Sequence, residues 1–157
     1  MSLCRDCFSS FTVSVEECAP RAVHGAVEIK MKRKVINLDG QKKNPHLSRA
    51  VRFGDLLFIS ATAARNPHTG QFPGSDMASQ TRQAFENLKE VLEAAGGSLK
   101  NVLKNTCYLV DMSQREAFDA VYREYFPEDP PARFCLILAD RGTGNLLEIE
   151  SIAGLES

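Results

Sequence analysis

One amphipathic helix constrains the fold of this chain more than any other sequence feature. Between Asp76 and Ala95, apolar or small side chains recur every three or four residues. They are Met77, Thr81, Ala84, Phe85, Leu88, Val91, Leu92 and Ala95. This period places them on one side of an α-helix and implies that the helix packs through one face. Gly96-Gly97 predicts its end, because glycine adopts the left-handed conformation of a helix terminus without steric cost.

Short apolar runs on both sides of this helix predict a sheet. We expect strands at 35–38, 102–110, 133–139 and 146–153, a hairpin over 48–60, and a second helix after Ser113. The continuous apolar run over 56–60 predicts a central strand buried on both faces. The order β-β-β-α-β-α-β-β is typical of an α+β fold. Right-handed crossovers place both helices on one face of its mixed β-sheet.

Length and charge exclude several classes of protein. The 157 residues suffice for one domain and carry 19 basic and 20 acidic side chains, a net charge of −1. This balance weighs against general nucleic-acid binding, which relies on an excess of positive charge. No apolar run approaches the roughly 18 residues of a membrane span, and no secretory or transit pattern is present. We therefore expect a cytoplasmic protein without membrane contact.

The sequence changes character near Met31. Residues 1–30 are rich in cysteine and lack sustained periodicity, whereas the later residues follow regular patterns. We therefore expect 1–30 to be an N-terminal extension, with a second start at Met31, and 31–157 to be the functional domain. The alternative is that 1–30 adds an irregular strand to the sheet.

Three of the five cysteines lie within the first 18 residues. Cys4-x-x-Cys7, followed by Cys18 and His24, offers the residue types of a zinc site but lacks the paired spacing of such sites. We therefore expect no metal. The odd number of cysteines without an export signal also weighs against a disulfide framework.

The last two predicted strands carry the residues best suited to chemistry. Alternation assigns Phe134, Leu136, Leu138, Leu147, Ile149 and Ser151 to the core. It assigns Arg133, Cys135, Ile137, Leu146, Glu148, Glu150 and Ile152 to the opposite, helix-free face. That face is too apolar to remain exposed and too charged for a core, so we expect a symmetric oligomer to cover it and to form clefts between subunits.

Arg133 and Glu148 are the candidate catalytic residues on that face. Arginine suits the binding of a carboxylate, because its planar group donates two parallel hydrogen bonds. A glutamate can position or deprotonate water. The alternative is an Arg–Glu ion pair at the edge of the sheet, without a catalytic role.

Two sequence motifs resemble those of a known family. Residues 131–135 (PARFC) together with 147–153 (LEIESIA) resemble the paired C-terminal signature of the Rid family (RidA/YjgF), the reactive-intermediate deaminases. Residues 80–88 and 93–97 resemble that family as well. The resemblance implies a chorismate-mutase-like subunit in a homotrimer with three sites between subunits. It further implies hydrolysis of small enamine or imine acids to 2-oxo acids and ammonia, without metal or cofactor.

The resemblance assigns roles to individual residues. Arg133 would bind the substrate carboxylate and Glu148 would orient the attacking water, while Ser60 and Cys135 match substrate-binding positions. Three further substrate-binding positions depart from the family pattern. His46 replaces the customary tyrosine, Ala61 replaces a glycine, and Asp119 replaces an asparagine on the second helix.

These departures keep several functions open. The Pro45-His46 stretch is similar to that of 2-aminomuconate deaminases, family members that act on a longer dicarboxylic enamine in aromatic compound degradation. A non-catalytic small-ligand-binding or chaperone-like role is the second alternative. An endoribonuclease role is the third, although the sequence lacks an interleaved basic and aromatic surface pattern.

Overall fold

A mixed six-stranded sheet organises the protein. The computed structural model describes residues 32–38, 40, 44–140 and 142–155. Its strands are β1 (Arg33–Ile36), β2 (Ala50–Phe53), β3 (Leu56–Ala63), β4 (Val102–Leu109), β5 (Ala132–Ile137) and β6 (Leu147–Gly154). Their order across the sheet is β1-β2-β3-β6-β4-β5. All neighbouring strands are antiparallel except β4 and β5, which are parallel. The predicted extension 1–30, including the cysteines considered for zinc, lies outside the described residues.

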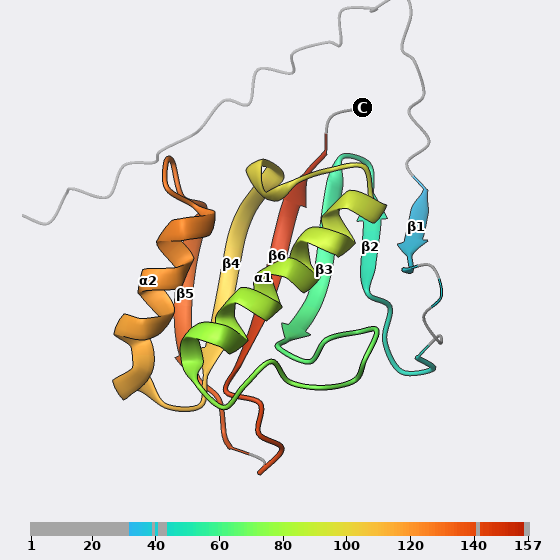
Figure 1. Cartoon of the computed structure of the whole chain (residues 1–157). Coiled ribbons are helices and arrows are strands. Elements are labelled where there is room, and N and C mark those ends of the chain that lie inside the picture. The colour runs from blue at the N-terminus through green and yellow to red at the C-terminus, as the bar shows by residue number, and fades with distance from the viewer. Residues whose placement is uncertain (1–31, 39, 41–43, 141, 156–157) are drawn as a thin grey trace, which may run out of the picture. The chain divides into compact units, whose positions relative to one another are not determined.

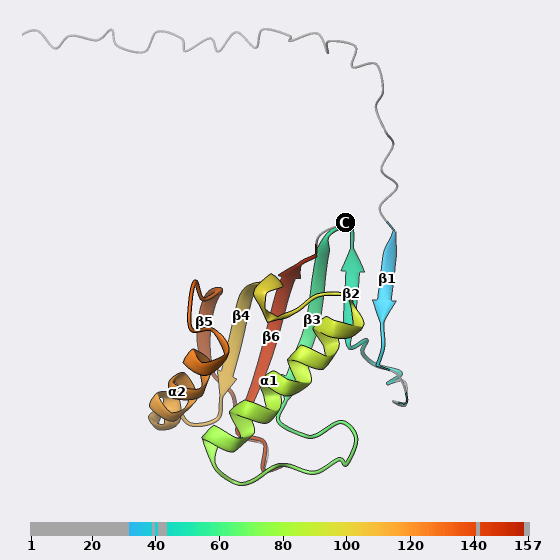
Figure 2. The same ribbon diagram turned by 45° about the horizontal axis from the view of Figure 1, so that its top comes forward.

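Two helices cover one face of this sheet, as the sequence predicts. They are α1 (Met77–Ala94) and α2 (Arg115–Tyr125), and both lie on the same side in two views (Figures 1 and 2). Two short 3-10 helices, Leu99–Asn101 and Met112–Gln114, precede β4 and α2. None of the helices in the described ranges is long and apolar enough to cross a membrane.

Helix α1 forms the centre of the core. Its stripe residues Phe85, Leu88 and Leu92 are fully buried, as are Leu57 and Ile149 of the sheet beneath. The helix begins after Asp76, whose Oδ1 accepts a hydrogen bond from the Ser79 N–H at 2.8 Å. It ends before Gly96, which has a φ of 85°. The predicted helix and its glycine terminus are therefore confirmed, and the structure adds the Asp76 cap at its start.

The expectation that β3 is buried on both faces is wrong for the single chain. The strand is central, because β2 and β6 flank it, but Leu56 and Phe58 remain 41% and 45% exposed. Leu57 and Ile59, which alternate with them, are buried in the core. The cause is the placement of both helices on one side (Figure 2), so that no described residues form a covering layer on the other side of the sheet, called here the open face.

A buried polar row links the sheet to α2. The Ser151 hydroxyl on β6 donates to Asn105 Oδ1 on β4 at 2.7 Å, and Asn105 Nδ2 donates to the Tyr122 hydroxyl on α2 at 3.0 Å. Asn105 and Ser151 are 0% and 1% exposed. A buried amide is costly unless its hydrogen bonds are made, so this row favours one position of α2 over the sheet.

We expect Asn105→Ala to lower the free energy of unfolding by about 2–4 kcal/mol, because it leaves the Ser151 and Tyr122 hydroxyls buried without their partner. Urea unfolding followed by circular dichroism measures the loss. Lys104→Ala, at the exposed neighbouring position of β4, is the control and should change stability by less than about 0.5 kcal/mol. Equal losses in the two variants would show that the polar row contributes little.

Candidate active site

Arg133 is held against α2 at the edge of the sheet. Its Nη1 donates to Asp119 Oδ1 at 2.6 Å, and its guanidinium carbon lies 4.5 Å from the centre of the Tyr122 ring. Asp119 Oδ2 also lies 3.5 Å from Nε of Arg115, one turn earlier on α2. We call Arg133, Asp119, Tyr122 and Cys135 the arginine cluster.

This position corrects the predicted faces of β5. Arg133 and Cys135 lie on the helix-covered side, whereas Phe134, expected in the core, is 59% exposed. Leu136, also expected in the core, is 37% exposed. The reason is that α2 presents an acidic and an aromatic partner to Arg133, while β5 is an edge strand whose residues are apolar on both sides. Leu146, expected on the open face, instead packs against the core.

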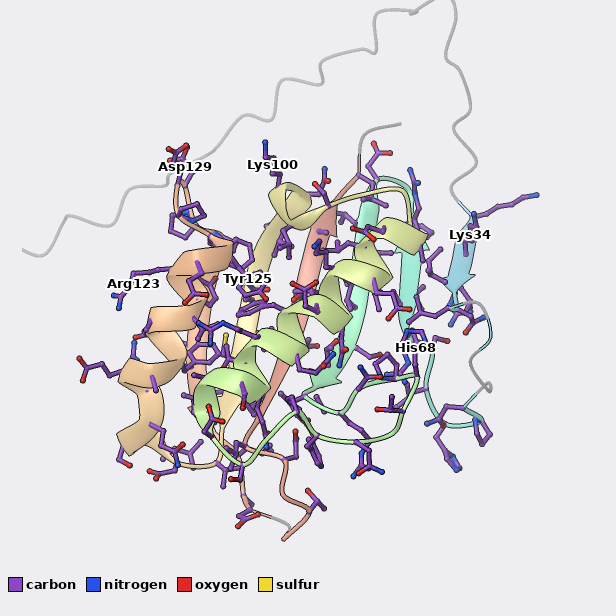
Figure 3. The ribbon with its side chains drawn as sticks, in the orientation of Figure 1. Lys34, His68, Lys100, Arg123, Tyr125 and Asp129 are labelled. Atoms are coloured by element: carbon purple, nitrogen blue, oxygen red, sulfur yellow. The ribbon has the colours of Figure 1, made fainter. Side chains whose placement is uncertain are left out.

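The arginine cluster borders a cavity of about 290 Å³. Its lining comprises Asp119, Tyr122, Arg123, Phe126, Pro130, Pro131 and Arg133. Arg123 extends outward from α2, whereas Tyr125 lies between the two helices, where its hydroxyl donates to Glu86 (Figure 3). The cavity therefore combines a cationic guanidinium and a carboxylate with apolar walls, a composition suited to a small charged organic molecule.

The charge of Arg133 is firmly maintained. Burial is the largest single influence on its pKa and lowers it, but the hydrogen bond and charge of Asp119, followed by the two nearby thiols, outweigh burial. The net effect raises the pKa of Arg133 above its ordinary value. The guanidinium is therefore positive at every pH at which the protein would be assayed.

Two thiols lie beneath Arg133. Cys107 and Cys135 are register partners on β4 and β5, and Cys107 is fully buried whereas Cys135 is partly exposed. Burial, and then the neighbouring Cys135, raise the pKa of Cys107 far above its usual range. Because the thiolate is the nucleophilic form, Cys107 is chemically quiet at neutral pH.

Glu148 lies on the open face, away from Arg133. Its neighbours Leu147 and Ile149 are buried in the core, so alternation along β6 directs Glu148 to the other side. Asn145 Nδ2 donates to Glu148 Oε1 at 3.4 Å. On the same face the Tyr108 hydroxyl donates to Glu150 at 3.4 Å, and partial burial followed by the Glu150 charge raises the pKa of Tyr108. We call Glu148, Glu150, Tyr108 and Asn145 the glutamate cluster.

Helix α1 fixes the start of the strand that carries Glu148. The side chain of Gln80 is 1% exposed and reaches the loop before β6. Its Nε2 donates to the Gly144 carbonyl at 2.8 Å, and its Oε1 accepts from the Leu146 N–H at 2.9 Å. A buried amide with both ends bonded to the backbone permits little movement of that loop.

Ser60 and Ala61 occupy an irregularity in β3. The pairing of β3 with β6 shifts register between Ile59 and Thr62, so these two residues form a bulge beside the strand of Glu148. The Ser60 hydroxyl donates to the Ser48 carbonyl at 2.8 Å. His46 lies in the exposed segment before β2, where its N–H donates to Asn44 Oδ1 at 2.8 Å.

The predicted site residues thus fall into two groups within one chain. Arg133, Asp119 and Cys135 come together on the helix-covered side, whereas Glu148 belongs to the open face. The paired strands place Arg133 opposite Asn105, and Glu148 opposite Tyr108. Strands β5 and β6 lie two strand spacings apart, which is roughly 10 Å across the sheet. The two partners on β4, Asn105 and Tyr108, are three residues apart, which adds roughly 10 Å along the strand. The prediction that Arg133 and Glu148 share one face is wrong, and one chain cannot bring both to the same small molecule.

Sequence reasoning missed three residues of the site. Tyr122 is not among the predicted site residues, although its spacing of three residues from Asp119 places both on one side of α2. Tyr108 lay within an expected strand and Asn145 within an expected loop, and neither carried a signal of its own. The described residues hold no group of three or more potential metal ligands.

Comparison with known proteins defines the class to which this fold and site belong. Residues 41–155 match the family described as Endoribonuclease L-PSP. A RutC family protein of Pyrococcus horikoshii is 40% identical over 123 residues, which are 78% of this chain and 98% of the relative. The 3-aminoacrylate deaminase RutC of Acinetobacter baylyi is 36% identical over 104 residues, 66% of this chain and 82% of the relative.

Solved structures agree with this assignment. RidA from an Antarctic Psychrobacter has a TM-score of 0.71 and 32% identity, over 78% of this chain and 99% of that one. Escherichia coli TdcF with bound serine has a TM-score of 0.71 and 28% identity, over the same shares. The chain therefore belongs to the Rid family, also called the YjgF/RutC family, and its α+β sheet with two helices on one face is the fold of that family. The resemblance found in the sequence is confirmed.

The thiols permit a direct check of the arginine cluster. In the folded protein we expect iodoacetamide at pH 8 to modify Cys107 at least roughly tenfold more slowly than Cys135, because burial keeps Cys107 protonated. Mass spectrometry of digested peptides locates the label, and the same reaction in urea should modify both. Rapid labelling of Cys107 in the folded protein would contradict the described packing of β4, β5 and α2.

Proposed function

We propose that this protein hydrolyses reactive enamine or imine acids to 2-oxo acids and ammonia, at sites between the subunits of a homotrimer. The observation that carries the proposal is a permanently charged arginine that lines a small cavity, in a family whose relatives include a named deaminase. The Reactive Intermediate Deaminase A of Arabidopsis thaliana, which is chloroplastic, is 33% identical over 108 residues, 69% of this chain and 58% of the relative. We propose a cytoplasmic location for this chain.

The reaction needs two functions that the two clusters can supply. Arg133 holds the substrate carboxylate through its remaining N–H groups, which fixes the imine carbon in the cavity. Glu148 accepts a hydrogen bond from a water molecule and directs it at that carbon. Attack forms a C–O bond and a tetrahedral carbinolamine. Transfer of a proton to nitrogen then breaks the C–N bond, and ammonia leaves as the 2-oxo acid forms.

The separation of Arg133 and Glu148 supports a site between chains. Because these residues face opposite sides of one sheet, they can meet only if a second copy brings its Glu148 to the Arg133 edge. The open face offers the apolar surface that such a contact needs, since Phe58, Leu103 and Phe134 are 45%, 53% and 59% exposed. The bulge at Ser60 and Ala61, next to β6, would reach the site from the same partner as Glu148.

The longer dicarboxylic substrate, 2-aminomuconate, is a second candidate within this proposal. Arg123 lines the same cavity as Arg133 and offers a second cation for a second carboxylate. His46, in place of the family's tyrosine, lies in the exposed segment before β2. The chaperone-like and endoribonuclease alternatives stay predictions from the sequence.

Complementation between two inactive variants tests the composite site. We expect Arg133→Ala and Glu148→Gln each to abolish ammonia release from imines generated in situ by an amino-acid oxidase. When the two variants are unfolded together and refolded as a mixture, an interface can pair an intact Arg133 with an intact Glu148. Random assembly should then restore about a quarter of the sites of the unaltered protein.

The matched control is each variant refolded alone, which should stay inactive. Failure of the mixture to regain activity, with mixed oligomers detected by mass spectrometry, would reject a site shared between chains. Ammonia release by Arg133→Ala alone would remove the proposed role of that residue.

The oligomer itself depends on the open face. We expect the full chain to sediment as a trimer and Phe58→Glu to shift it toward the monomer, because the substitution places a charge on the apolar surface between subunits. Ala94→Glu, which adds the same charge at an exposed position of α1, should leave the trimer intact. Analytical ultracentrifugation distinguishes these states. A trimeric Phe58→Glu would show that the open face is not the contact.

A further inference from the structure

We propose that Asp119 makes the Arg133 site select ligands that carry a positively charged nitrogen beside their carboxylate. This proposal rests on the proposed function and deepens it. The substrate would be the protonated, iminium form of a 2-imino acid, bound through its carboxylate to Arg133 and through its nitrogen to Asp119.

The geometry places both charges in one cavity. Asp119 and Arg133 line the same space, and their side chains retain 25% and 24% exposure, so a ligand can reach either group. Tyr122 supports the guanidinium from one side through its ring. A ligand of a few atoms that enters this cavity meets a cation and an anion whose nearest atoms are 2.6 Å apart.

The Asp119 charge changes which ligands the arginine can accept. A ligand with only a carboxylate brings a second negative charge to a guanidinium that already has an anionic partner, so Asp119 repels it. A ligand with an adjacent cationic nitrogen offsets this repulsion, because its N–H group can donate to Asp119. An asparagine, the residue the family resemblance leads us to expect here, would lack this discrimination.

Other charges near Asp119 leave room for such a ligand. Arg115 approaches Asp119 Oδ2 at 3.5 Å, but its side chain is 51% exposed and the contact is long for a charged hydrogen bond. Arg123 is an exposed cation that also lines the cavity, so the ligand's carboxylate, and not its nitrogen, would face that side. Oδ2 is therefore the atom that a ligand nitrogen would contact, with displacement of Arg115 toward solvent.

The same contact would assist hydrolysis. An iminium carbon is more electrophilic than that of a neutral imine, and the Asp119 carboxylate favours the protonated form. Water adds to the iminium carbon and forms the C–O bond. The C=N π electrons move to nitrogen, and the attached water loses one proton to solvent or Glu148, which gives the carbinolamine. Protonation of its nitrogen lets the C–N bond break, so that ammonia leaves with the electron pair while the hydroxyl loses its proton and the C=O bond of the 2-oxo acid forms.

Charge selectivity can be measured without turnover. Isothermal titration calorimetry on the full-length protein compares 2-oxobutyrate, which carries a carboxylate alone, with 2-aminobutyrate, which adds an ammonium group. In Asp119→Asn we expect 2-oxobutyrate to bind about fivefold to tenfold more tightly and 2-aminobutyrate to bind more weakly by a similar factor. Asp119→Glu, which keeps the charge, should retain the preference for 2-aminobutyrate.

The matched control is Glu116→Gln, which removes one negative charge from an exposed position on the same helix and should leave both affinities unchanged. Equal changes for the two ligands in Asp119→Asn would show that Asp119 only positions Arg133, and would overturn the proposal. Absence of binding of either ligand to the unaltered protein at millimolar concentration would overturn it as well.

Measurement of turnover tests the proposed function independently of the ligand affinities. Ammonia release is measured separately on imines formed in situ. Charge-dependent binding without ammonia release supports the selectivity and rejects the deaminase function. Ammonia release, together with equal changes in the two ligand affinities on Asp119→Asn, rejects the selectivity and leaves the deaminase function in place.

Discussion

The buried amide of Asn105 is the interaction on which the arginine cluster depends. It accepts a hydrogen bond from β6 and donates one to α2, so a single side chain connects the centre of the sheet to the helix above its edge. The Tyr122 hydroxyl accepts that hydrogen bond, and the ring of the same residue supports Arg133. Displacement of α2 would leave buried polar atoms without partners, and this penalty holds the helix and the guanidinium in one arrangement.

The one-sided placement of the helices has a second effect, which is to separate two kinds of chemistry. Cationic and aromatic groups gather where α2 covers β5, while the carboxylates of β6 lie on the uncovered side. Each cluster is held by its own part of the core: Tyr122 belongs to an aromatic group with Phe85 and Phe118, and the start of β6 is bonded to Gln80. Within one chain, this fold therefore keeps the arginine cluster and the glutamate cluster on different sides of the sheet.

Sequence reasoning was accurate where one helical period dominated the apolar pattern. It failed where apolar residues occupied every position of a strand, so that alternation gave no side. The stripe of α1 has a single helical period, so its range and ends followed from the residues alone. Strand β5 reads Phe134-Cys135-Leu136-Ile137, apolar at every position, and alternation could not decide which side faces the helices. The outcome depended on Asp119 and Tyr122, which lie on α2, 14 and 11 residues before Arg133, and hold Arg133 on their side of the sheet. Motifs nominated candidate residues such as Arg133 and Glu148, whereas their grouping, and the neighbours Tyr122, Tyr108 and Asn145, required the tertiary fold.

The stacking of Arg133 on Tyr122 has a consequence for the entropy of binding. A free arginine side chain has many rotamers, and a ligand that fixes them loses part of its binding energy in doing so. Here the Tyr122 ring and the Asp119 carboxylate already restrict the side chain within the folded chain. The rotational freedom of the guanidinium is lost when the chain folds, so a larger share of each hydrogen bond made to a ligand can appear as affinity.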